Sequence, residues 1–183
     1  MRILGIAGSV RRESHNRKLL RAAGDALPPA VELVEWDGLA SLPIFDQDLE
    51  LEPPASVREL LDAIEDADAL LIATPEYNAS LPGGLKNALD WASRPFPDNV
   101  LRHKPSAVIG SSTGLFGAVW AQAEVRKVLK ASGADVVENE LPVGMADSAF
   151  TDDGKLADPE LTARLADVLG DLAREVMSPA EAA

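Results

Sequence analysis

The sequence predicts an α/β protein in which five parallel strands form a single doubly wound sheet with helices on both faces. Short apolar segments alternate along the chain with longer segments of helical periodicity. Five strand–helix pairs follow one another, and this order is typical of a doubly wound sheet. With 183 residues, we expect one domain over residues 1–177, followed by a flexible tail at 178–183.

The strands are predicted from apolar residues bounded by turn residues. Residues 2–7 (RILGIA) precede a Gly-Ser pair, and residues 69–74 (ALLIAT) precede a proline, so both are expected as buried strands. Residues 31–36 (VELVEW) mix apolar and acidic residues, as an edge strand would. The two remaining strands are expected at 106–110 and 134–137.

The helices are predicted from apolar residues that recur every three or four positions. Ser56 and Glu59 form a Ser-x-x-Glu pattern, which predicts a capping box at the start of the second helix. Pro82 fits the first position of the third helix. The expected helices are residues 16–27, 56–66, 83–93, 118–132 and 159–177.

The composition excludes several kinds of chemistry. The chain has no cysteine, which rules out disulfides, thiolate nucleophiles and zinc–thiolate sites. His15 and His103 are far apart in sequence, so a multi-histidine metal site is not expected. The net charge of −13 makes nucleic acids and anionic membranes poor partners. Neither a signal peptide nor a long apolar segment is recognised, so we expect a cytoplasmic protein.

The loop after the first strand, Gly8 to Asn16, has the chemistry of a phosphate site. The helix that follows presents unpaired N–H groups and the positive end of its dipole. Short polar side chains and Arg11 add donors, while Gly8 permits a close turn around a ligand. The alternative is a capped helix after a polar turn. The candidate cofactor-binding residues of this loop are Ser9, Arg11, Ser14, His15 and Asn16.

The loops after the third and fourth strands could hold a flat ring. Tyr77, the only tyrosine, could cover such a ring, and small residues from Ser111 to Gly114 leave room beside it. The alternative is that both loops are ordinary turns. The candidate residues in these loops are Pro75, Glu76, Tyr77, Asn78, Ser111 and Ser112.

Three stretches, GSVRRESHN, TPEYNASLPGGLKNALDW and SSTGLFGAVWAQAEVRKVL, resemble the NADPH-dependent FMN reductase family. That family includes flavodoxin-like quinone, chromate and azo-dye reductases. The resemblance implies a flavodoxin-like sheet of order 2-1-3-4-5, FMN as cofactor and NADPH or NADH as co-substrate. It also implies a small acceptor such as a quinone, an azo dye, a metal oxyanion or free flavin.

The resemblance also implies roles for the candidate residues. The first loop would bind the FMN phosphate through Ser9, Arg11, Ser14 and Asn16, while residues 75–78 would lie beside the isoalloxazine and residues 111–112 would contact it. No side chain is expected to act as a catalytic acid, base or nucleophile, because the flavin carries the chemistry. No metal is expected.

Other functions with the same fold stay open at this point. One is a flavodoxin-type electron carrier, although the phosphate loops of such carriers are usually rich in Thr and Ser and lack an arginine like Arg11. Others are a flavin-binding module without turnover and an α/β domain that holds a different phosphate.

The resemblance implies a homodimer or tetramer, with Lys86, Asn87, Asp90 and Trp91 in the interface region. Some relatives carry an arginine and a tyrosine that support a tetramer, at the places of Trp120 and Ala123, and Ala118 replaces the second glycine of a Gly-Gly pair. A dimer is therefore expected. Trp91 lies off the apolar stripe of its helix, so we predict that it packs at this interface; the alternative is the edge of its own core.

Overall fold

The computed structural model describes residues 1–177; the tail expected at 178–183 lies outside the described residues. Five parallel strands form one sheet in the order β2-β1-β3-β4-β5, which confirms the predicted fold and strand order. The strands are β1 (Arg2–Ala7), β2 (Glu32–Trp36), β3 (Ala69–Thr74), β4 (Pro105–Ser111) and β5 (Asp135–Val143).

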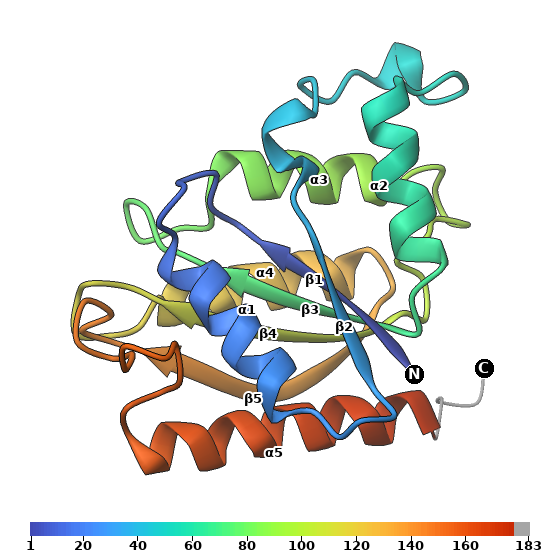
Figure 1. Ribbon diagram of the computed structural model, residues 1–183. Helices are drawn as coiled ribbons and strands as arrows, with labels where there is room; N and C mark the ends of the chain where they lie inside the picture. Colours follow the sequence, from blue (N-terminus) through green and yellow to red (C-terminus); the bar gives the residue numbers. More distant parts are fainter. Residues whose placement is uncertain (178–183) are drawn as a thin grey trace.

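Helices cover both faces of this sheet (Figure 1). α1 and α5 pack on one face, and α2, α3 and α4 pack on the other. Two short 3-10 turns, η1 (Gly38–Ser41) and η2 (Gln47–Leu49), lie in the long loop between β2 and α2. The helices are α1 (His15–Ala26), α2 (Ala55–Glu65), α3 (Gly83–Ala92), α4 (Val119–Ala131) and α5 (Pro159–Met177).

The central strands supply side chains to two hydrophobic cores. In β3, Leu71 and Ala73 pack toward α1 and α5, whereas Leu70 and Ile72 pack toward the other three helices. All six residues of β3 are buried, which is expected of a strand covered on both faces. Within residues 1–177, no helix is long and apolar enough to cross a membrane.

β5 is longer than its sequence predicts. The expected strand ended at residue 137, but β5 continues to Val143 past a register shift opposite Ser106 and Val108. The added part contains the polar residues Glu138 and Asn139 and a proline, Pro142. At the edge of the sheet such residues can face solvent, while Leu141 and Val143 are fully buried against the α1–α5 side.

The predicted capping box at Ser56 is wrong. α2 begins at Ala55 and its N-cap is Pro54, whose carbonyl accepts the first backbone hydrogen bonds of the helix, from Val57 and Arg58. Ser56 therefore lies inside the first turn, where its side chain cannot cap. Pro82 is likewise the N-cap of α3 rather than its first helical residue.

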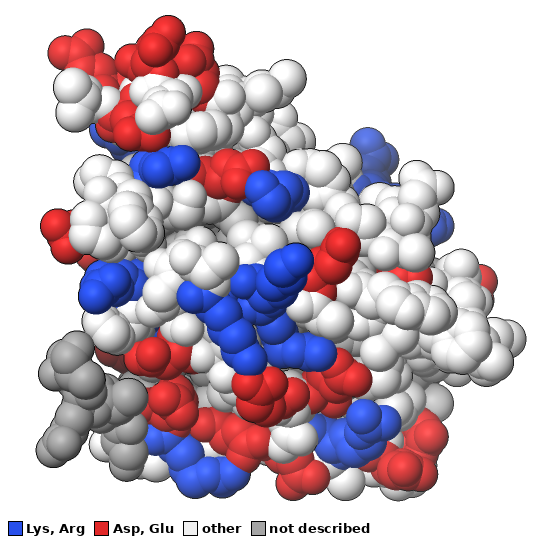
Figure 2. Space-filling view, turned by 180° about the vertical axis from the view of Figure 1, so that it is seen from behind, with Lys and Arg blue, Asp and Glu red and all other residues white. Residues whose placement is uncertain are grey.

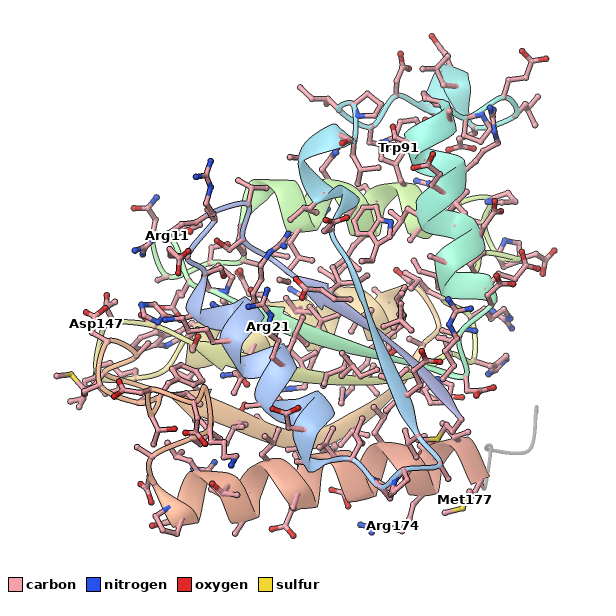
Figure 3. The ribbon with its side chains drawn as sticks, in the orientation of Figure 1. Arg11, Arg21, Trp91, Asp147, Arg174 and Met177 are labelled. Carbon is pink, nitrogen blue, oxygen red and sulfur yellow. The ribbon has the colours of Figure 1, made fainter. Side chains whose placement is uncertain are left out.

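The predicted interface position of Trp91 is also wrong. Its side chain is buried within its own chain, with 2% of its surface exposed (Figure 3). The indole Nε1 donates to the Pro43 carbonyl at 2.9 Å, and the ring meets Phe45 edge-on at 4.9 Å between centroids. Asn87 holds the same segment through Pro43 and Phe45. The β2–α2 loop thus covers a part of α3 that helical periodicity alone left exposed.

The surface carries many acidic side chains, and basic side chains gather near the middle of the face seen in Figure 2. α4, which lies on this side of the sheet, carries Arg126, Lys127 and Lys130. Arg126 pairs with Glu140 of β5 at 2.5 Å, and Lys130 pairs with Glu138. Much of the positive charge of α4 is therefore neutralised by its neighbouring strand.

Candidate active site

The loops that follow β1, β3 and β4 enclose one cavity at the carboxyl edge of the sheet. Its volume is about 130 Å³. Ten of the eleven candidate residues line it, and Asn78 is the one that does not. Thr113, which lies in the expected stretch of small residues but was not named as a candidate, also lines the cavity. The strand order brings these three loops together, because parallel strands present all their carboxyl ends at one edge.

The first loop delivers the N-terminus of α1 to this cavity. Ser14 is the N-cap, and its hydroxyl accepts from the backbone N–H of Arg17 at 3.4 Å. The hydroxyl of Ser9, which is also buried, accepts from the N–H of Arg11 at 3.3 Å. The Arg11 side chain is exposed at the rim and makes no ion pair within residues 1–177 (Figure 3). A helix terminus beside a free guanidinium is a favourable site for an anion.

Asn16 joins the first loop to the end of β4. Its Nδ2 donates to the Ser111 carbonyl at 3.0 Å, and its Oδ1 accepts from the Ser111 N–H at 2.9 Å. Only 3% of Asn16 is exposed. The side-chain amide retains one N–H and one lone pair beyond these two bonds. Its contact with a phosphate stays a prediction, whereas its contact with Ser111 fixes the distance between two walls of the cavity.

His15 ties the cavity to the segment after β5. Its Nε2 lies 3.1 Å from Oδ1 of Asp147, and its ring stacks on Phe150 with 6.3 Å between centroids. The other ring nitrogen, Nδ1, is buried without a hydrogen-bond partner in the described part of the chain. Asp147 was missed from the sequence, because 132 residues separate it from His15.

The loop after β3 makes a tight turn at its tip. Tyr77 and Ser80 exchange two backbone hydrogen bonds of 3.1 Å, and between them Asn78 and Ala79 adopt φ values of 55° and 58°. Asn78 therefore sits at the exposed tip, which explains why it does not line the cavity. Tyr77 lines the cavity with 53% of its surface exposed, so its ring is available to a ligand at the mouth.

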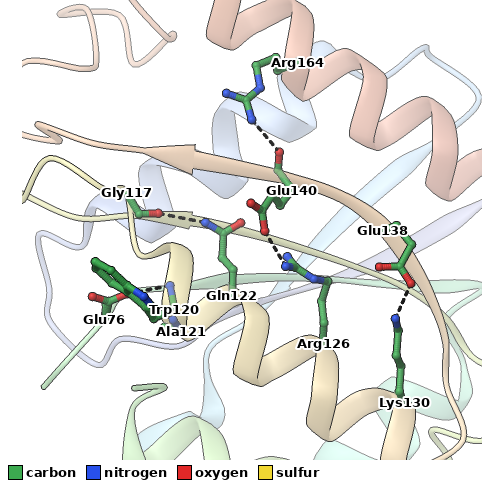
Figure 4. Close-up of polar contacts among 10 residues, drawn as sticks. All are labelled: Glu76, Gly117, Trp120, Ala121, Gln122, Arg126, Lys130, Glu138, Glu140 and Arg164. Carbon is green, nitrogen blue, oxygen red and sulfur yellow. Dashed lines mark hydrogen bonds and ion pairs between the residues drawn. The ribbon is translucent and has the colours of Figure 1, made fainter. Parts of the chain in front are cut away.

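Two glutamates hold this loop against α4 from opposite sides. Oε2 of Glu76 accepts from the backbone N–H groups of Trp120 and Ala121, at 3.1 and 3.2 Å (Figure 4). In return, Oε2 of Glu124 on α4 accepts from the Ser80 hydroxyl at 2.6 Å and from the Leu81 N–H at 3.0 Å. Glu76 thus caps the N-terminus of α4, where a negative charge is stabilised.

These hydrogen bonds act on the acidity of Glu124. The Ser80 hydroxyl, and then the Leu81 amide, favour the charged carboxylate and hold its pKa below the ordinary value. Glu124 was not a candidate from the sequence, since nothing in the pattern of α4 shows that it reaches a loop 44 residues earlier.

The loop after β4 is built close to the backbone of β5. The Ser112 N–H donates to the Val143 carbonyl at 3.0 Å, and the Ser112 hydroxyl accepts from the Gly114 N–H at 3.1 Å. Gly117 has φ +59°, and a Cβ there would lie 2.4 Å from the Pro142 carbonyl carbon. Nε2 of the buried Gln122 donates to the Gly117 carbonyl at 2.9 Å (Figure 4). Only glycine fits at position 117.

The residues present fit the phosphate end of FMN. At the wall where the flavin ring is expected, Ser111 Oγ is buried and has no hydrogen-bond partner within residues 1–177. The helix N-terminus and Arg11 supply the positive field that a phosphate requires. The ring would lie between the Tyr77 loop and the small residues from Ser112 to Gly114.

Comparison with known proteins agrees with this geometry. The profile of the family described as NADPH-dependent FMN reductase matches residues 1–148. A 2-hydroxy-1,4-benzoquinone reductase from a Burkholderia species is 44% identical over 128 residues, which cover 70% of this chain and 69% of the relative. An NAD(P)H-dependent FMN reductase from Pseudomonas aeruginosa is 39% identical over 160 residues, which cover 86% of this chain and 85% of the relative.

A solved structure is similar along nearly the whole chain. The flavoenzyme NAD(P)H:(acceptor) oxidoreductase FerB from Paracoccus denitrificans superimposes with a TM-score of 0.85 at 33% identity. The match covers 97% of this chain and 98% of FerB. These relatives are enzymes, so the electron-carrier and non-catalytic alternatives lose their support. The chain belongs to the NADPH-dependent FMN reductase family and is an oxidoreductase that uses FMN as cofactor and NAD(P)H as co-substrate.

Proposed function

We propose that the physiological acceptor is a small, flat, conjugated molecule of the quinone class. The observation that carries this proposal is a group of exposed aromatic side chains on the Tyr77 loop and the segment bonded to it. Tyr77 lines the cavity, and Phe116 and Trp120 are 60% and 49% exposed, with ring centroids 5.2 Å apart. The bond from Glu76 to the Trp120 N–H keeps this pair next to the Tyr77 loop. Flat apolar molecules stack on such side chains, whereas a metal oxyanion gains little from them.

The names of relatives support the same acceptor class. The Burkholderia relative is a benzoquinone reductase, and a relative from Pseudomonas putida, 40% identical over 157 residues, is a quinone reductase. Azo dyes, metal oxyanions and free flavin are the competing acceptors.

When bound, FMN would supply the redox chemistry between the nicotinamide donor and the acceptor. We infer that Ser9, Arg11 and Ser14 bind its phosphate, with His15 and Asn16 completing that end of the cavity. Pro75, Tyr77, Ser111 and Ser112 would border the ring. Glu76 acts with Glu124 to keep the covering loop in place, and Asn78 would meet the ring only where it extends past the turn. In this proposal no side chain transfers a proton as acid or base.

We propose that the chain forms a homodimer whose interface lies at the groove between α3 and α4. This groove, of about 310 Å³, is lined partly by Lys86, Arg94 and Val128, and by Phe96, which is 70% exposed. Trp91 has no part in the proposal. The net charge of −13 argues against nucleic acid and anionic membranes as partners. A location in the cytoplasm would give the protein access to nicotinamide nucleotides.

An acceptor panel tests the proposed function. The FMN-loaded protein is reduced anaerobically with NADPH or NADH and then mixed with a benzoquinone, an azo dye, chromate or free FMN. We expect the largest kcat/KM for the quinone. Trp120→Ala should lower quinone kcat/KM by roughly 5- to 10-fold, as expected for a lost aromatic contact, and leave chromate unchanged. Leu51→Ala, at a site 95% exposed in the β2–α2 loop, is the control. A higher kcat/KM for chromate than for the quinone would contradict the proposal.

A further inference from the structure

A second hollow adjoins the cavity on the side of the edge strand β2. Its volume is about 370 Å³, and it is lined by residues 10–14 together with Arg17, Lys18 and Arg21. It shares Arg11 and Ser14 with the cavity that fits the FMN phosphate. The two spaces therefore meet at the first loop, and the hollow is the more basic of the two.

The positive charge of this hollow is only partly neutralised. Glu35 of β2 pairs with Arg17 at 3.2 Å and approaches Arg21 at 3.9 Å. Arg11, Arg12 and Lys18 make no ion pair among the described residues, and Glu13 is the one carboxylate in the lining. On α4, by contrast, Arg126 and Lys130 are each paired with a glutamate of β5. In a chain of net charge −13, an unneutralised basic hollow attracts anions locally.

The topology sets the hollow in line with the rest of the site. The order β2-β1-β3-β4-β5 arranges the loops in a row along the carboxyl edge of the sheet. The loops after β3 and β4 border the expected place of the ring, the loop after β1 holds the phosphate cavity, and the hollow lies beyond it, since Arg17 and Arg21 reach Glu35 near the end of β2. A dinucleotide with its nicotinamide over the ring can extend along this row.

We propose that this basic hollow binds the adenosine phosphates of NADPH, with the 2′-phosphate against Arg12 and Lys18, and that it makes the enzyme prefer NADPH to NADH. NADH lacks only this phosphate, so side chains that bind it discriminate between the two donors. The guanidinium of Arg12 offers a planar set of donors to phosphate oxygens, and the Lys18 ammonium adds a point charge. The inference rests on the NAD(P)H-dependent activity of the family and deepens the function proposed above.

The test uses adenosine 2′,5′-bisphosphate and adenosine 5′-monophosphate as probes, titrated by calorimetry into the FMN-loaded protein. We expect the bisphosphate to bind at least about tenfold more tightly, because the second phosphate adds charge-assisted hydrogen bonds. Arg12→Glu and Lys18→Glu should each remove about tenfold or more of bisphosphate affinity and change the monophosphate less. In turnover they should raise KM for NADPH more than KM for NADH. Arg102→Glu, an exposed change of equal charge before β4, is the control.

Glu13→Gln provides an independent test that still applies if Arg12→Glu and Lys18→Glu lose FMN. Removing the only carboxylate in the lining should tighten bisphosphate binding without creating a new contact. Equal affinity of wild type for the two probes overturns the proposal. A bisphosphate preference that survives Arg12→Glu and Lys18→Glu also overturns the proposal. That result would be expected if the hollow bound an acidic partner protein instead of the nucleotide. Quinone reduction at saturating NADPH is measured in parallel, and its absence would refute the proposed function while leaving the probe result intact.

Discussion

Replacing Asn16 by alanine should damage both the fold and the binding of FMN. The Asn16 side chain is the bridge between the phosphate loop and the end of β4, through two hydrogen bonds to the backbone of Ser111. Asn16→Ala removes the hydrogen-bond partner of the Ser111 N–H and of the Ser111 carbonyl. The site is buried, since only 3% of Asn16 is exposed. The cavity wall formed by Ser111 then loses its tie to α1.

The size of the effect follows from these two groups. A buried polar group that loses its partner costs about 1–3 kcal/mol, so the two groups set a range of about 2–6 kcal/mol. The neighbouring cavity can admit water to them, which favours the lower end of that range, about 2–3 kcal/mol. FMN affinity should fall about tenfold or more, because the two walls of the cavity are no longer held together.

Asn99 offers a matched control at the opposite edge of the sheet. It is 7% exposed, its Nδ2 donates to the Ser132 carbonyl at 3.2 Å, and its Oδ1 accepts from the Leu101 N–H at 3.0 Å. Urea unfolding of the FMN-free variants should show a loss of stability for both Asn16→Ala and Asn99→Ala. Added FMN should stabilise Asn99→Ala as much as wild type, and Asn16→Ala less. An unchanged unfolding free energy for FMN-free Asn16→Ala would refute the reasoning, and so would equal stabilisation of the two variants by FMN.

Three further predictions follow from the loops and the open ring face. Gly117→Ala should destabilise the fold by more than about 2 kcal/mol in urea unfolding, because its Cβ would meet the β5 backbone, whereas Gly83→Ala, with open space around it, should be neutral or stabilising. The depressed pKa of Glu124 means that its carboxylate stabilises the fold above its ordinary pKa and loses this effect as pH falls through the folded pKa. Wild type and Glu124→Gln should therefore differ in unfolding free energy near neutral pH and converge in acid; a gap that persists in acid would contradict this origin. If the Tyr77 loop covers one face of the flavin ring, donor and acceptor must use the other face in turn. Turnover should then be ping-pong, with parallel double-reciprocal plots and inhibition by high acceptor that NADPH relieves; converging lines would indicate a ternary complex.

The order of elements and the position of the site could be predicted from the sequence because both depend on local patterns. Apolar runs and helical periodicity give the alternation of strands and helices. The polar loop from Ser9 to Asn16 directly after a buried strand gives the anion site, since a parallel sheet brings its carboxyl ends to one edge. The same logic brought the loops at Tyr77 and Ser111 into one cavity with it.

The remaining features depend on contacts between distant segments. Trp91 is buried because residues 43–45 fold over α3, and no periodicity within α3 contains that information. The two bonds from Asn16 to Ser111 span 95 residues, and those from Glu124 to Ser80 and Leu81 span 44 and 43. From a sequence pattern alone, asparagine and glutamate side chains are usually interpreted as ligand-binding or solvent-exposed groups. Only the packed structure shows that they hold loops in place.

The identity of the phosphate site is tested most directly by comparing FMN with riboflavin, which lacks the phosphate, on wild type and Arg11→Ala. Arg11 makes no ion pair within residues 1–177, so its removal should leave the fold intact. Fluorescence titration of the apoprotein should show a loss of about 1.5–3 kcal/mol in FMN binding, roughly 10- to 150-fold in Kd, with riboflavin binding unchanged. Equal losses for the two ligands would contradict the assignment of Arg11 to the phosphate and the placement of FMN in this cavity.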